Sequence, residues 1–130
     1  MNYFNSNKID LRHVVGFFRA LADPTRCKIL ILLWDRTYCV CELTAALDLA
    51  QPTISRHLRI LEQVGFVRSD RRGQRMDYSL ALEDSEEIDT LLKMLKDWLE
   101  DSQEMEELRD KIRQIADVGP CMEKKALLTP

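Results

Sequence analysis

The order of hydrophobic patterns between residues 24 and 80 constrains the fold more than any other feature of this chain. Two apolar helical stretches, at about 24–34 and 40–47, lead through a short turn into a third helix over about 51–64. Gly65 follows directly, where a glycine in the left-handed conformation commonly ends a helix. These signals predict two helices followed by a turn and a third helix.

A β-hairpin is predicted immediately after this helical unit. Residues 66–69 and 76–80 alternate between apolar and polar side chains, and the segment 70–75 between them contains Gly73 and three arginines. Helices followed by a hairpin with a basic tip predict a winged helix-turn-helix, a mainly α fold with a small β-hairpin. In that fold the second helix of the pair enters the DNA major groove and the hairpin, or wing, contacts the backbone.

Helices are also predicted on both sides of this unit. Apolar side chains recur at helical spacing over about 10–22, and Asp23 is a candidate N-cap for the next helix, with Pro24 at its first position. A single long amphipathic helix is predicted over about 85–116, with more apolar surface than one small core covers, so part of it is expected to meet another subunit. We therefore predict one DNA-binding and dimerisation domain over 1–116 and a mobile tail over 117–130.

Composition fits one soluble domain of 130 residues, with 45% apolar and 32% charged residues. The longest apolar run, residues 29–34, is too short to span a membrane, and residues 1–8 lack the layout of a signal peptide. We expect a cytoplasmic protein with no membrane partner, whose cysteines stay reduced. The net charge of −3 is uneven, because residues 51–80 hold six arginines and three acidic residues. That basic segment favours nucleic acid as a partner.

The helix over 51–64 offers a polar face suited to DNA. Ile54, Leu58 and Leu61 are expected to face inward, which leaves a set of side chains that can bond base edges or phosphates. This set is Gln51, Thr53, Ser55, Arg56 and Arg59. His57 is expected to brace the helix or donate to a phosphate, and the wing candidates are Arg71, Arg72 and Arg75.

Two cysteines stand at the start of the helix that precedes this DNA reader. On a regular helix the side chains of Cys39 and Cys41 would point roughly 200° apart. They can hold one ion only if Cys39 lies just before the first turn, or if that turn unwinds. Soft thiolates suit As(III), Sb(III), Cd(II) and Pb(II), and a helix N-terminus is expected to lower the thiol pKa. Cys27 is interpreted as a packing residue.

These motifs together resemble the ArsR/SmtB family of bacterial metal-sensing repressors. The resemblance rests on four segments, at residues 21–26, 39–43, 51–58 and 61–67. It implies a homodimer, joined through the first and last helices, that binds a palindromic operator and releases it when an inducer binds. The segment at 39–43 resembles the thiol site of the arsenic- and antimony-sensing branch.

The resemblance also has a departure, because Thr44 stands where that branch often has a third cysteine. The third sulfur is then expected from Cys121 or from a small thiol. We predict no permanent cofactor, As(III) or Sb(III) as inducer, and repression of a resistance operon.

Other functions stay open at this point. A repressor of the same fold could respond to thiol oxidation, or to Cd(II) or Pb(II), although residues 1–26 lack the cysteines of the cadmium branch and residues 81–130 lack the histidines of the zinc branch. A protein-interaction module built on the acidic last helix is a further alternative. An enzyme is not expected, since the chain has two histidines, no Cys-x-x-Cys and no glycine-rich phosphate loop.

Overall fold

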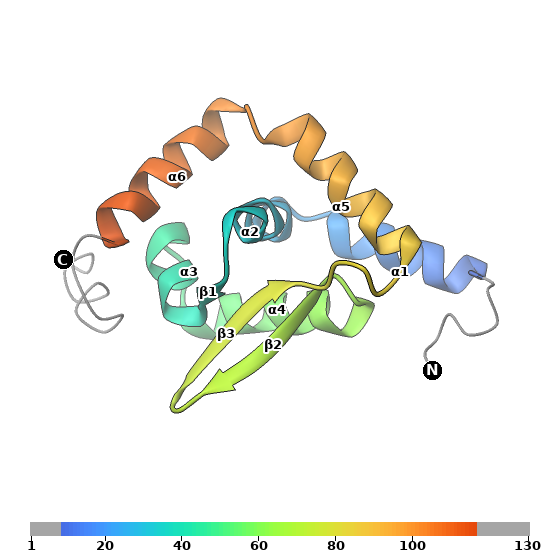
Figure 1. The fold of residues 1–130 in the computed structure, drawn as a ribbon, viewed down its shortest axis with the longest axis horizontal. Helices are drawn as coiled ribbons and strands as arrows, with labels where there is room; N and C mark the ends of the chain where they lie inside the picture. The colour runs from blue at the N-terminus through green and yellow to red at the C-terminus, as the bar shows by residue number, and fades with distance from the viewer. Residues whose placement is uncertain (1–8, 117–130) are drawn as a thin grey trace.

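The computed structural model describes residues 9–116, which form six helices and a small sheet (Figure 1). The helices are α1 Leu11–Leu21, α2 Pro24–Asp35, α3 Val40–Leu47, α4 Gln51–Val64, α5 Glu86–Leu99 and α6 Gln103–Ala116; the strands are β1 Tyr38–Cys39, β2 Val67–Arg72 and β3 Arg75–Leu80. The predicted winged helix-turn-helix, mainly α with a small β-hairpin, is confirmed. Within the described range, no helix combines the length and apolarity needed to cross a membrane.

Helix α2 is the centre of the fold. Its residues Ile29 to Leu33 are all buried, and α1, α4, α5, α6 and β3 contact it from different sides. The indole nitrogen of Trp34 donates to the carbonyl of Leu92 at 3.0 Å, which ties α2 to α5. Burial of this whole apolar run stabilises the core around which the helix-turn-helix and the thiol-bearing elements are arranged.

The predicted helix boundaries around the helix-turn-helix are confirmed. The Asp23 carboxylate accepts hydrogen bonds from the backbone N–H groups of Thr25 (2.8 Å) and Arg26 (3.1 Å), with Pro24 at the first helical position. Gly65 ends α4 with a φ of 102°, a conformation that a side chain would strain. Local sequence chemistry therefore sets the start of α2 and the end of α4.

The sheet has one strand more than the predicted hairpin. Strands β2 and β3 form the antiparallel wing, and β1 pairs with the other edge of β3 in the order β1-β3-β2. In this short ladder Tyr38 lies opposite Tyr78, and Cys39 lies opposite Asp77. A two-residue strand has no alternating pattern to detect, so its pairing depends on the tertiary fold.

The prediction of one long helix over 85–116 is wrong. The chain turns after α5, and the Ser102 hydroxyl accepts from the Met105 N–H at 3.3 Å where α6 begins. Helix α6 then runs beside α3 of the same chain (Figure 1). It packs on α2 and α3, and this packing buries Met105, Ile112 and Ile115. Two ion pairs hold it, Arg109 with Asp35 at 2.7 Å and Lys111 with Asp48 at 2.6 Å. The second half of the apolar stripe is thus covered within the chain.

Candidate metalloid site and nucleic-acid interface

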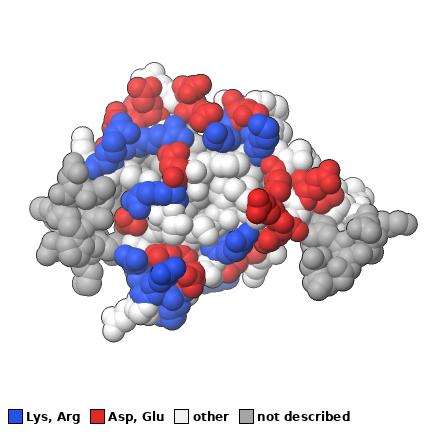
Figure 2. All heavy atoms as spheres, in the orientation of Figure 1, with Lys and Arg blue, Asp and Glu red and all other residues white. Residues whose placement is uncertain are grey.

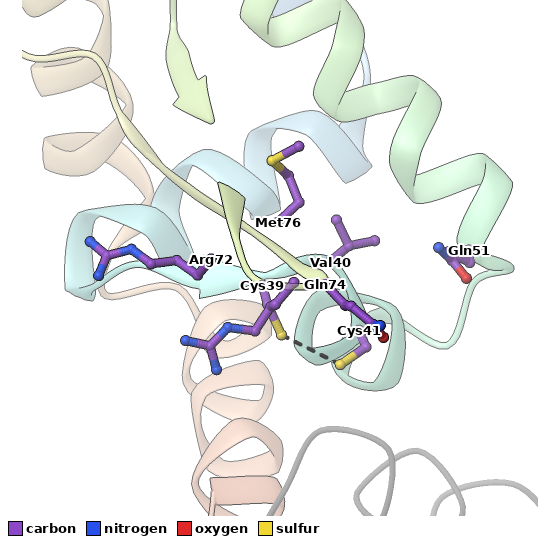
Figure 3. A pocket seen from close by; sticks show the side chains of 8 residues that line it. Cys39, Val40, Cys41, Gln51, Arg72, Gln74 and Met76 are labelled. Atoms are coloured by element: carbon purple, nitrogen blue, oxygen red, sulfur yellow. Dashed lines mark hydrogen bonds between the residues drawn. The ribbon is translucent and has the colours of Figure 1, made fainter. Parts of the chain in front are cut away.

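Cys39 and Cys41 are brought together by a change of backbone conformation between them. Cys39 belongs to β1 and is the N-cap of α3, with extended backbone angles (φ −87°, ψ 164°), whereas Cys41 lies in the first turn of the helix. The two Sγ atoms are 3.4 Å apart and face each other (Figure 3). Cys39 thus lies just before the first turn of α3, which is the arrangement that two cysteines spaced i, i+2 need to hold one ion.

An ion-pair network supports the backbone at this point. The Cys39 N–H donates to Glu42 Oε1 at 3.0 Å, and Arg36 contacts the other carboxylate oxygen of Glu42 at 3.2 Å. Burial alone would raise the pKa of Glu42, but the Cys39 and Arg36 contacts outweigh it and lower that pKa. Glu42 therefore stays ionised and fixes the start of α3 next to the sulfurs.

The expected lowering of the thiol pKa is wrong for Cys39. Burial raises the pKa of the Cys39 thiol, and its hydrogen bond to the backbone at Glu42 only partly opposes this. The side chain is 2% exposed, so loss of water dominates over the helix N-terminus. Cys39 is consequently a neutral thiol at rest, and binding of a thiophilic ion has to release its proton.

The cysteines differ in their bonding and in their surroundings. Cys27 and Cys39 are not part of a disulfide, whereas Cys41 is, so ion binding at the pair concerns the reduced protein. The Cys27 thiol donates to the Leu21 carbonyl at 3.2 Å and packs against the core, as interpreted from the sequence. The Thr44 hydroxyl donates to the Val40 carbonyl at 2.8 Å, which engages it with its own helix. Cys121 lies outside the described residues.

The two sulfurs belong to two different parts of the winged helix-turn-helix. Cys39 pairs with Asp77 of the wing strand β3, and Cys41 belongs to α3, which packs on α4. No group of three or more His, Cys, Asp or Glu side chains placed to hold a metal occurs among residues 9–116. A single ion bound to both sulfurs would therefore connect the wing with the helix that positions α4.

A cavity of about 510 Å³ adjoins the sulfur pair (Figure 3). It opens between the start of α3, the first residue of α4 and the wing. Its lining residues are Cys39, Val40, Cys41, Gln51, Arg72, Gln74, Arg75 and Met76. One cavity is thus lined both by the candidate inducer ligands, Cys39 and Cys41, and by two candidate DNA contacts of the wing, Arg72 and Arg75.

The predicted polar face of α4 is present. Ile54, Leu58 and Leu61 are fully buried, as expected from the sequence. Gln51, Arg56 and Arg59 are exposed, and Thr53 and Ser55 are half-buried. This arrangement leaves a row of hydrogen-bonding groups on the surface of the second helix of the helix-turn-helix.

The wing carries three exposed arginines at or near its tip. Arg72 contacts Asp70 at 2.9 Å, Arg75 contacts Asp77 at 3.0 Å, and Arg71 donates to the Gly73 carbonyl at 3.4 Å. Figure 2 shows Lys and Arg gathered at the hairpin tip, while acidic groups interleaved with basic ones follow the edge formed by α5 and α6. On the face shown, the hairpin tip is thus a basic part of the segment 51–80, whose excess of arginine the sequence predicted.

His57 does not belong to the exposed face of α4. Its side chain is buried, and its Nδ1 lies 3.0 Å from a guanidinium nitrogen of Arg26, whose Nε donates to the Ala20 carbonyl at 2.6 Å. Burial and the neighbouring Arg26 charge lower the pKa of His57, so the neutral ring accepts from Arg26. The structure places His57 as a brace between α4 and α2, and we leave it out of the proposed DNA contacts.

Sequence reasoning missed the residues that support the sulfur pair. Glu42 stands three residues after the N-cap, where a capping-box acid belongs, and this spacing was a readable signal. Arg36, which contacts Glu42, and Gln74, which lines the adjoining cavity, carry no comparable signal in the sequence.

Comparison with known proteins assigns this arrangement to a family. Residues 23–69 match the family model described as "Bacterial regulatory protein, arsR family". The chain is 43% identical over 81 residues to the arsenic resistance transcriptional regulator ArsR1 of Pseudomonas putida, and 41% identical over 68 residues to the arsenical resistance operon repressor of Escherichia coli. These matches cover 62% and 52% of this chain, and only 63% and 58% of the length of the two relatives.

A solved structure extends the match over most of a second protein. The ArsR family transcriptional regulator RHA00566 is 30% identical, with a TM-score of 0.56, and the match covers 76% of this chain and 95% of that one. A winged helix-turn-helix with these motifs defines a class of transcriptional regulators and not of enzymes. The chain belongs to the arsR family of bacterial regulatory proteins.

Proposed function

We propose that this chain is a homodimeric cytoplasmic repressor that binds operator DNA and releases it when trivalent arsenic or antimony binds Cys39 and Cys41. The observation that carries the proposal is the sulfur pair, 3.4 Å apart, at the junction of the wing and the DNA-reading helices. The names of the arsenic-resistance relatives support the same inducer class.

The sulfur geometry favours a pyramidal ion. With ion–sulfur bonds of about 2.3 Å, two sulfurs 3.4 Å apart subtend roughly 95° at the ion, narrower than the roughly 109° of a tetrahedral site. Trivalent arsenic and antimony form three bonds in a pyramid, which fits the narrower angle. We assign the third sulfur to Cys121 or to an external thiol.

The proposed route to DNA release uses the two contacts of the segment that holds the sulfur pair, the packing of α3 on α4 and the pairing of β1 with β3. Bonding of both sulfurs to one ion changes the relation between β1 and the first turn of α3. Helix α3 packs on α4, and β1 pairs with β3, so both DNA-contacting elements move with it. In a dimer, a shift of each α4 disturbs the one-turn spacing on which binding to two half-sites depends.

The proposed DNA contacts lie on α4 and the wing. Gln51, Thr53, Ser55, Arg56 and Arg59 are proposed to face the major groove. Arg71, Arg72 and Arg75 are proposed to contact phosphates.

Dimerisation is proposed through α1 and α5. Leu11 (78%), Phe18 (54%) and Trp98 (73%) are large apolar side chains with high exposure, and Val14 and Val15 on α1 are exposed with them. Such a surface is expensive to leave in water and is typical of a contact between subunits. Helix α6 is not part of the proposed interface, because its apolar side is buried within the chain.

The function is tested by selecting a binding site from a random duplex library and titrating the reduced protein–DNA complex with arsenite. We expect DNA affinity to fall at least about tenfold on arsenite binding, in the range of known allosteric couplings. Cys39→Ser and Cys41→Ser should keep DNA binding and lose the response. Cys27→Ser is the matched control, because its hydroxyl can keep the bond to the Leu21 carbonyl. DNA binding that persists at saturating arsenite, with thiols verified as reduced, contradicts the proposal.

The thiol-redox alternative has an observation of its own, since Cys41 takes part in a disulfide. If peroxide releases the DNA and arsenite does not, the redox function replaces the one proposed. Titration with Cd(II) and Pb(II) in the same assay decides among the soft ions.

A further inference from the structure

We propose that the cavity beside the sulfur pair binds an anionic low-molecular-weight thiol, which supplies the third sulfur to the trivalent ion. This inference rests on the proposed function, since it concerns the ion held by Cys39 and Cys41. It names the chemical class of a second ligand: a small molecule with a thiol and at least one carboxylate.

The composition of the cavity wall carries the proposal. The two sulfurs line one part of the cavity, and Figure 3 shows Arg72 and Gln74 of the wing in the same lining. Arg75 of the wing also lines the cavity. None of the described residues that line the cavity is acidic. The volume of about 510 Å³ is within the range of small-molecule sites. It is larger than a lone ion needs.

The wing arginines can accept a carboxylate without losing their present partners. Arg72 contacts Asp70 through Nε, and Arg75 contacts the two oxygens of Asp77 through Nε and one terminal nitrogen, and both guanidinium groups remain largely exposed. Each guanidinium has five N–H donors, so Arg72 with one donor engaged and Arg75 with two engaged both keep donors for a second anion. The amides of Gln51 and Gln74 add neutral hydrogen-bonding groups to the same wall.

The chemistry balances with arsenous acid and three thiols. Three As–O bonds and three S–H bonds break, three As–S bonds form, and three water molecules leave. Arsenic stays trivalent, and no sulfur is oxidised. Cys39 and Cys41 provide two of the thiols, and the external molecule provides the third.

Occupation of this site also affects the proposed DNA interface. Arg72 and Arg75 are among the side chains assigned to phosphate contacts. A carboxylate bound to them competes with phosphate for the same donors. The ternary complex is therefore expected to release DNA more completely than arsenite with a neutral thiol.

The test compares arsenite binding by the reduced full chain in the presence of mercaptosuccinate, which is anionic, and of 2-mercaptoethanol, which is neutral. Native mass spectrometry detects the protein–arsenic–thiol complex, and titration gives the apparent arsenite affinity at a fixed thiol concentration. We expect the anionic thiol to give an affinity about fivefold higher, from two partly exposed ion pairs. The double variant Arg72→Gln/Arg75→Gln should abolish that preference.

Arg71→Gln is the matched control, because Arg71 is a wing arginine that does not line the cavity. It should keep the full preference for the anionic thiol. Equal affinity with both thiols in the parent protein overturns the inference, as does retention of the preference in the double variant. A complex that holds arsenic without external thiol, and loses it in Cys121→Ser, assigns the third sulfur to Cys121. That result refutes the inference and leaves the proposed function intact, whereas absence of arsenic binding with either thiol refutes both.

Discussion

Replacing Ile112 by alanine tests whether α6 is docked on its own chain. The Ile112 side chain is 7% exposed, on the helix that covers α2 and α3. Truncation removes buried carbon atoms and leaves a cavity, which costs about 2–4 kcal/mol of the free energy of unfolding. The matched control is Gln114→Ala, an exposed position on the same helix, where a change within about 0.5 kcal/mol is expected.

Urea unfolding followed by far-UV circular dichroism, at several protein concentrations, measures this effect. A docked α6 predicts that the loss for Ile112→Ala is the same at every concentration, because the contacts lie within one chain. If α6 instead continued α5 into a partner subunit, the loss would depend on protein concentration and would disappear where the dimer dissociates. A loss below about 0.5 kcal/mol at all concentrations would refute the docking of α6.

Two further predictions concern other parts of the fold. Burial lowers the pKa of His57 below its usual value of about 6.5, so the unfolded chain takes up this proton at a higher pH than the folded chain. The free energy of unfolding should therefore decrease as pH falls below about 6.5 and through the folded pKa. In His57→Asn the urea midpoint should depend less on pH in that window. An unchanged pH dependence of the midpoint in this variant would contradict the Arg26 brace. Phe18→Glu, at a side chain 54% exposed, should weaken the dimer at least about tenfold in sedimentation velocity, and an unchanged dissociation constant would exclude this α1 surface from the interface.

The elements that the sequence predicts well are those defined by local chemistry. Asp23 and Pro24 begin α2, Gly65 ends α4, and the alternation after it forms the wing, because each of these signals acts within a few residues. The sequence predicts that Cys39 and Cys41 can face each other only if Cys39 lies before the first helical turn or that turn unwinds. The extended backbone of Cys39 meets the first of these conditions.

The features that were missed depend on contacts between distant segments. The apolar spacing continues from α5 into α6, so it does not reveal the turn at residues 100–102, which is set by docking on α2 and α3. Strand β1 exists only because β3 lies beside it. The pKa of Cys39 was expected to be lowered by the helix, but tertiary burial raises it instead.

Helix α6 packs against α3 and restrains its position. Its buried side chains and the Lys111–Asp48 ion pair hold the face of α3 that it covers, while α4 and the sheet contact α3 elsewhere. Under the proposed function, we expect α6 to resist movement of α3 when an ion binds the sulfurs, so that the displacement falls on α4 and the wing. In that proposed mechanism, α6 is the rigid support against which a small change at the sulfurs displaces the surface assigned to DNA.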